Sequence, residues 1–277
     1  KEDHSALLVK TTPGVRISLS FCPRILTTYF SPSKTLQYNT KNVHKSTSKM
    51  SNNKGKKAAV ILAGNGVYDG SECTEVISTL IHLDKHGVGV TCFAPTMKQK
   101  HVINHIKGEE MEGERDVAVE SARLARGKVS DLASLSAKDF DAVFVPGGFG
   151  VAKNLSTYAF DGAAGMTILP EVERVLKEFH ELKKPIALCC IAPVLGCKLF
   201  PNAEFTFGKK SGDGWPYAGT SEDCEKLGCK IMEKESNEFH VDDMNKIVTA
   251  PAYMNDNTPY GIFENVGQWV TAALELI

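Results

Sequence analysis

From residue 58 onward the chain alternates short apolar runs with amphipathic stretches of helical length, and this alternation restricts the fold more than any other feature. The apolar runs have the length of buried strands and lie at 58–64, 88–95, 141–150, 185–188, 203–208 and 246–253. The helical stretches lie at 71–87, 116–127, 169–185, 220–228 and 262–277. Because strands separated by helices form parallel βαβ units, we expect an α/β fold with a mostly parallel central sheet covered on both faces.

The first 57 residues have a different composition from the rest of the chain. They contain 11 Lys and Arg residues, frequent Ser and Thr, and only two acidic residues, Glu2 and Asp3. This composition is typical of a mitochondrial or plastid transit peptide, and the alternatives are a disordered tail or a true start at Met50. We therefore expect residues 1–57 to lie outside the fold and residues 58–277 to form one α/β domain. The location expected is mitochondrial, or cytoplasmic if translation starts at Met50.

Charge and hydropathy argue against two classes of partner. Of the chain's 32 basic and 33 acidic residues, 21 basic and 31 acidic ones fall in residues 58–277, and such an acidic domain is a poor nucleic-acid binder. No run approaches the 18 or so apolar residues of a membrane span. The eight cysteines include no CxxC pair and no zinc-site spacing, so we expect reduced thiols and no metal.

Cys190 lies where a predicted strand breaks into a predicted helix. Ile186 to Leu188 end the strand, and Pro193 suits the first turn of the next helix. A cysteine at such a break can stand above the sheet as a nucleophile, and the helix N-terminus would lower its pKa. Cys189 should face the other way, because side chains alternate along a strand. The alternative is that both cysteines are small buried hydrophobes.

The segment "VPGGFG" follows the strand at 141–150 and supplies backbone N–H groups. Gly147 and Gly148 allow a tight turn, and the N–H groups of Gly148 and Ile191 could together hold an oxyanion beside Cys190. A plain glycine turn is the alternative.

The segment "GNGVYDGSECTE" ends with two carboxylates at the start of a helix. Its glycines do not have the spacing of a dinucleotide-binding loop, so we expect no nicotinamide site. Glu72 and Glu75 are three residues apart, which puts them on one helix face near the predicted thiol. Either could move a proton during catalysis, or could simply stabilise the helix N-terminus.

The histidines offer no base for Cys190. Ile191 follows the cysteine, and His240 is predicted to begin a surface strand. His101 and His105 are four residues apart without a third metal ligand, and His105 is a candidate for lining the substrate pocket with Gly147.

Seven segments of residues 58–277 resemble one family. They are "GVYDGSE", "HVINHIKGE", "ESARLARGKVSDL", "PGGFGVAKNLS", "CCIAPVL", "WPYAGT" and "NKIVTAPAY". Together they resemble the mitochondrial glutamine amidotransferase-like class 1 domain family, which is related to bacterial ElbB within the PfpI-like superfamily. The resemblance implies a flavodoxin-like three-layer sandwich, a thiol at Cys190 and a glutamate at Glu72 or Glu75. It also implies a homodimer.

The resemblance implies a glyoxalase that needs neither glutathione nor any other cofactor, because bacterial ElbB is described as acting on glyoxal. The substrate expected is therefore a small aldehyde, converted to a 2-hydroxy acid through a hemithioacetal on Cys190. Lys209 and Lys210 stand where many superfamily members carry a histidine, which argues against protease and glutaminase activity. A redox-sensing or partner-binding protein with an oxidisable cysteine is the alternative.

Overall fold

The computed structural model describes residues 53–277, and the predicted transit peptide lies almost wholly outside them. A central sheet of seven strands runs in the order β10-β11-β7-β6-β1-β2-β5. All of its pairs are parallel except β10 with β11. The strands are β1 (Lys57–Ile61), β2 (Gly89–Ala94), β5 (Val129–Asp131), β6 (Ala142–Val145), β7 (Ile186–Cys189), β10 (His240–Asp242) and β11 (Ile247–Ala250).

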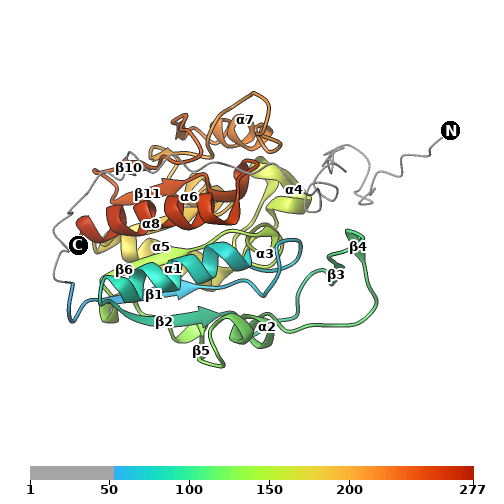
Figure 1. Cartoon of the computed structure of the whole chain (residues 1–277), viewed down its shortest axis with the longest axis horizontal. Helices are drawn as coiled ribbons and strands as arrows, with labels where there is room; N and C mark the ends of the chain where they lie inside the picture. The colour runs from blue at the N-terminus through green and yellow to red at the C-terminus, as the bar shows by residue number, and fades with distance from the viewer. Residues whose placement is uncertain (1–52) are drawn as a thin grey trace, which may run out of the picture. The chain divides into compact units, whose positions relative to one another are not determined.

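Helices cover the sheet, as the alternation predicts. Helices α1 (Cys73–Lys85) and α8 (Pro259–Glu275) lie side by side over one face (Figure 1), and α5 (Pro170–Glu181) packs on β6 and β7. The α8 side chain Trp269 is fully buried, and its Nε1 donates to the carbonyl of Val248 in β11 at 3.0 Å. The flavodoxin-like three-layer arrangement with a mostly parallel sheet is confirmed.

The remaining elements are short. Helices α2 (Val117–Leu124), α3 (Phe149–Lys153), α4 (Tyr158–Gly165), α6 (Pro193–Leu199) and α7 (Gly219–Glu225) complete the helical layers, and 3-10 turns lie at Leu132–Ser134, Ala137–Asp139 and Ala252–Met254. Two separate ribbons pair β3 (Ile103–Asn104) with β4 (Glu109–Glu110), and β8 (Glu204–Phe205) with β9 (Lys230–Ile231). The run at 203–208 thus forms only a two-residue strand outside the central sheet. Helices α3 and α4 were not expected from hydrophobic periodicity, because their segments are short and rich in Gly and Ala.

The strand order decides where the three predicted motifs meet. Strands β1, β6 and β7 are neighbours and parallel, so the segments that follow them emerge at the same edge of the sheet. Those segments carry Glu72 and Glu75, Gly147 and Gly148, and Cys190.

Candidate active site

Cys190 occupies a backbone conformation that breaks the strand. Its φ is 57°, in the left-handed region that few residues other than glycine adopt, and its N–H donates to the carbonyl of Ala250 at 3.0 Å. The side chain is 7% exposed. A residue held in this conformation costs on the order of 1–3 kcal/mol, and such positions cluster at functional sites.

Glu75 lies fully buried beside this cysteine. Its Oε2 accepts the Gly147 N–H at 2.8 Å, and its Oε1 accepts the Tyr253 N–H at 3.2 Å. A side-chain hydrogen bond joins the Glu75 carboxyl to Cys190. Burial, followed by the charge of Glu72, raises the pKa of Glu75 to about 8. A carboxyl with this pKa is suited to moving protons near neutral pH.

Glu72 has a different role from Glu75, although the sequence made both acids candidates for proton transfer. It is the N-cap of α1, and its Oε2 accepts the Glu75 N–H at 2.8 Å. Such caps satisfy one of the unpaired N–H groups that begin every helix. Burial raises the pKa of Glu72 as well. The geometry places Glu75, and not Glu72, against the thiol.

Gly147 fits the space beside the cysteine, and Gly148 the space beside the backbone of residues 70–72, because both lack side chains. A β-carbon on Gly147 would lie 2.4 Å from Cys190 Cβ and 2.9 Å from Glu75 Oε2. Gly148 has a φ of 96°, and its N–H forms a hydrogen bond with the Cys190 sulfur. Ile191, the other predicted oxyanion donor, follows Cys190 directly and is half-buried.

The predicted effect on the Cys190 pKa is wrong. Burial raises the pKa of the thiol well above its ordinary value, and the Glu75 carboxyl adds to the increase. The Gly148 N–H acts in the opposite direction but is outweighed. In the resting protein, therefore, the thiol keeps its proton until a base accepts it, and Glu75 is the adjacent group able to do so.

The predicted orientation of Cys189 is also wrong. Its Sγ lies 3.8 Å from Glu75 Oε2, on the same carboxyl that contacts Cys190. Side chains alternate only within a regular strand, and the left-handed backbone of Cys190 interrupts that regularity. Cys189 is fully buried, and burial raises its pKa strongly. The Cys189 side chain therefore packs against the Glu75 carboxyl.

Two tyrosines complete the surroundings, and sequence reasoning did not assign them. Tyr253 comes just after β11 and supplies a backbone N–H to Glu75. Tyr217 lies in the "WPYAGT" segment, contacts the Phe149 ring at 6.1 Å between centroids, and interacts with both Cys190 and Tyr68. Burial raises the pKa of Tyr217 to about 12, so its hydroxyl remains a hydrogen-bond donor at neutral pH. Tyr217 of "WPYAGT" is therefore close enough to Cys190 for an electrostatic interaction with the thiol.

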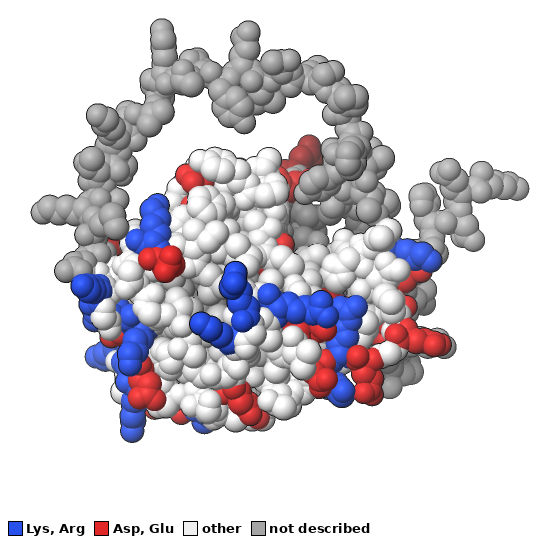
Figure 2. All heavy atoms as spheres, turned by 60° about the horizontal axis from the view of Figure 1, so that its bottom comes forward, with Lys and Arg blue, Asp and Glu red and all other residues white. Residues whose placement is uncertain are grey.

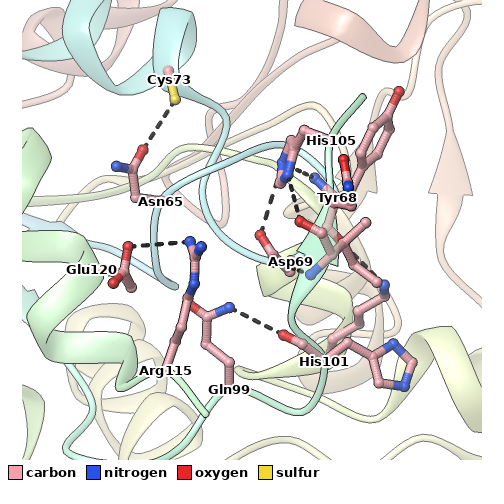
Figure 3. Close-up of polar contacts among 12 residues, drawn as sticks. Asn65, Tyr68, Asp69, Cys73, Gln99, His101, His105, Arg115 and Glu120 are labelled. Atoms are coloured by element: carbon pink, nitrogen blue, oxygen red, sulfur yellow. Dashed lines mark hydrogen bonds and ion pairs between the residues drawn. The ribbon is translucent and has the colours of Figure 1, made fainter. Parts of the chain in front are cut away.

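His105 lies in a neighbouring polar cluster (Figure 3) and has no direct contact with Cys190 in any hydrogen bond of the described chain. Its Nε2 accepts the Tyr68 N–H at 3.2 Å, and its Nδ1 donates to the carbonyl of Ile103 at 3.1 Å. Asp69 Oδ1 is 3.8 Å from Nε2. His105 therefore supports the loop that leads to Glu72 and Glu75. His101 packs edge-on against Phe160.

The rest of the described surface shows intermixed charge. On the face in Figure 2, Lys and Arg lie beside Asp and Glu. Ion pairs among the described residues include Lys177–Glu173 and Lys209–Glu235. No group of three or more His, Cys, Asp or Glu side chains within residues 53–277 could hold a metal ion. None of the helices in the same range has the length and apolar character needed to cross a membrane.

Comparison with known proteins identifies the family. Human glutamine amidotransferase-like class 1 domain-containing protein 3, mitochondrial, is 52% identical over 223 residues, which cover 79% of this chain and 83% of the relative. The chain belongs to this family. The family is the one that the seven segments predicted, and the mitochondrial location is confirmed: the protein is mitochondrial. No general protein-family model matches the sequence.

Solved structures agree with this assignment. The isoprenoid biosynthesis protein with amidotransferase-like domain from Ehrlichia chaffeensis is 35% identical, covers 80% of this chain and 99% of its own, and superposes with a TM-score of 0.72. Glyoxalase III from Candida albicans shares the fold, with a TM-score of 0.50, 14% identity, and coverage of 78% of this chain and 97% of its own. The chain therefore has the amidotransferase-like fold of the Ehrlichia protein.

Proposed function

We propose that this protein converts glyoxal, or a similar small dicarbonyl, to a 2-hydroxy acid without glutathione. The observation that carries the proposal is the contact of Cys190 with a fully buried Glu75 whose pKa is about 8. The contact puts a nucleophile beside a group that can accept and return its proton near neutral pH. The occurrence of the same fold in a glyoxalase III supports the proposal at the level of the fold alone.

In the first step, Glu75 takes the proton of the Cys190 thiol as the sulfur adds to one aldehyde carbon. The new C–S bond forms while the C=O π electrons move to oxygen. The resulting alkoxide takes from Glu75 the proton that came from the thiol, which gives a hemithioacetal and restores the Glu75 carboxylate. The Gly148 N–H, which contacts the sulfur in the resting protein, can donate to the developing oxyanion. The Ile191 N–H is the second predicted donor.

In the second step, Glu75 moves a proton between the two carbons of the hemithioacetal. Its carboxylate removes the proton from the carbon bonded to sulfur, which gives an enediolate. Its carboxylic acid then returns this proton to the other carbon, while the hydroxyl proton of the sulfur-bearing carbon passes to the second oxygen. The product is a thioester of the 2-hydroxy acid. Water then attacks the thioester carbonyl, releases glycolate and restores the Cys190 thiol, so no electrons enter or leave the overall reaction.

The test is glycolate formation from glyoxal by the full chain and by three variants. Cys190→Ala should abolish saturable turnover, and Glu75→Gln should lower kcat by about 10² to 10⁴-fold. The control is Cys92→Ala, which removes a buried thiol in β2 and should keep turnover near that of the wild type. Wild-type turnover at the uncatalysed rate would overturn the proposal and favour a redox or partner-binding role for Cys190.

A further inference from the structure

Three cysteines gather away from the candidate active site. Cys197 lies in α6, Cys224 in α7, and Cys229 in the turn between α7 and β9. Cys197 shares side-chain hydrogen bonds with both of the others. The Cys229 Sγ donates to the backbone carbonyl of Cys224 at 3.0 Å. We call these three residues the α6–α7 thiol cluster.

Cys229 differs from Cys197 in exposure and in acidity. Cys197 and Cys224 are 0% exposed, whereas Cys229 is 5% exposed. The hydrogen bond from Cys197 lowers the pKa of Cys229, whereas burial raises the pKa of Cys197 well above its ordinary value. Because the thiolate is the nucleophile, Cys229 is the member that reacts first with an electrophile.

The hydrogen bonds also select the partner of Cys229. Its S–H is directed at the carbonyl of Cys224 and not at the Cys224 sulfur, whereas its sulfur accepts a hydrogen bond from the Cys197 side chain. The sulfur that contacts a reacting Cys229 through a side-chain hydrogen bond is therefore that of Cys197. Three thiols without a fourth ligand do not make a metal site, which agrees with the result for the described residues.

We propose that Cys229 and Cys197 form a reversible intramolecular disulfide when the protein meets hydrogen peroxide. The Cys229 thiolate attacks one peroxide oxygen, the O–O bond breaks, and the leaving hydroxide takes a proton to give water and a sulfenic acid. The Cys197 sulfur then attacks the Cys229 sulfur, the S–S bond forms, and the second oxygen leaves as water. The two thiols lose two electrons, which the peroxide accepts, and an external dithiol reverses the reaction.

The disulfide would join the helix that begins beside Cys190 to the entrance of β9. α6 starts three residues after Cys190, and α7 follows the segment that carries Tyr217. Cross-linking α6 to Cys229 therefore ties the helix that follows Cys190 to the turn that follows α7. The thiol cluster uses none of the residues assigned to glyoxal conversion, so the two proposals stand or fall separately.

The test uses the full chain carrying Cys190→Ser, so that the active-site thiol does not consume the oxidant. The protein is treated with hydrogen peroxide, its remaining thiols are alkylated after denaturation, and its peptides are analysed by mass spectrometry. We expect one cross-linked peptide that contains Cys197 and Cys229, disappears on reduction and leaves Cys224 alkylated. A non-reducing gel should show a single chain.

Two variants test which cysteine pairs with Cys229. In Cys197→Ser, Cys229 should stop at the sulfenic acid and be captured by dimedone, whereas Cys92→Ser, which removes an isolated buried thiol, should leave the cross-link unchanged. A cross-link that includes Cys224, a cross-link between two chains, or sulfinic acid at Cys229 without any cross-link would overturn the proposal. If Cys197→Ser does not fold, the cross-linked peptide of the protein carrying Cys190→Ser alone still tests the proposal.

Discussion

A β-carbon on Gly147 would lie 2.4 Å from the β-carbon of Cys190, so the cysteine occupies the space that any other side chain at 147 would need. The same position donates its N–H to Glu75 at 2.8 Å. Gly147, which follows β6, therefore contacts both the thiol of Cys190 after β7 and the carboxyl of Glu75 after β1. The contact explains why "VPGG" needs a residue without a side chain beside Cys190.

Gly147→Ala should remove turnover of glyoxal and lower the free energy of unfolding by about 1–3 kcal/mol, because the methyl group overpacks Cys190 and Glu75. Urea unfolding and glycolate formation measure the two effects. The control is Gly219→Ala, where no atom lies within 4 Å of the added carbon. Equal behaviour of the two variants would show that the close contact has no consequence.

Glu72→Gln and Glu75→Gln should separate the two acids that the sequence left equal. Glu75→Gln should lower kcat by about 10² to 10⁴-fold, since an amide cannot exchange a proton with Cys190. Glu72→Gln should keep most of the turnover and change the free energy of unfolding by less than about 1 kcal/mol, since the amide oxygen can still cap α1 and only the charge at the helix N-terminus is lost. If kcat falls more in Glu72→Gln, the assignment of Glu75 as the proton-transfer group is wrong.

The pKa of Glu75 makes the stability of the fold depend on pH. The carboxyl has an ordinary pKa of 4.5 and a pKa of about 8 in the folded protein, so between these values the unfolded chain releases a proton that the folded chain keeps. The stabilisation is present below pH 4.5 and is lost as the pH rises to about 8. This contribution has a slope of at most about 1.4 kcal/mol per pH unit.

Denaturant unfolding of the wild type and of Glu75→Gln across this pH range checks the sign. The difference in the free energy of unfolding, wild type minus variant, should fall steadily with rising pH, because the glutamine side chain of the variant does not titrate. A difference that stays constant or rises with pH would show that Glu75 keeps an ordinary pKa.

Much of this site follows from strand ends, and the rest depends on contacts between distant segments. Parallel strands place the segments after them at one edge of the sheet, which is why Cys190, Gly147 and Glu75 could be expected near one another. The sign of the Cys190 pKa shift could not be predicted, because it depends on how fully the thiol is buried. Tyr253 contributes a backbone N–H from beyond β11, and no motif marks such a group. The catalytic roles themselves stay predictions.

Asn154, the C-cap residue of α3, holds the loop before Glu72 through hydrogen bonds of its side chain. Its Nδ2 donates to the carbonyls of Ala63 and Asp69, at 2.9 Å each, and its Oδ1 accepts the Lys100 N–H at 2.9 Å. The side chain is buried, so Asn154→Ala leaves these backbone groups unpaired.

Asn154→Ala should lower the free energy of unfolding by about 1–3 kcal/mol and also lower turnover, because the loop it holds leads directly into α1 and Glu75. Asn104→Ala is the matched control, since the Asn104 side chain accepts only the N–H groups of Ile106 and Lys107 within its own exposed turn. Thermal unfolding and glycolate formation compare the two variants. Loss of stability in Asn154→Ala with unchanged kcat would show that the loop does not position Glu75, whereas a loss of both would connect the hydrogen bonds of Asn154 to the site.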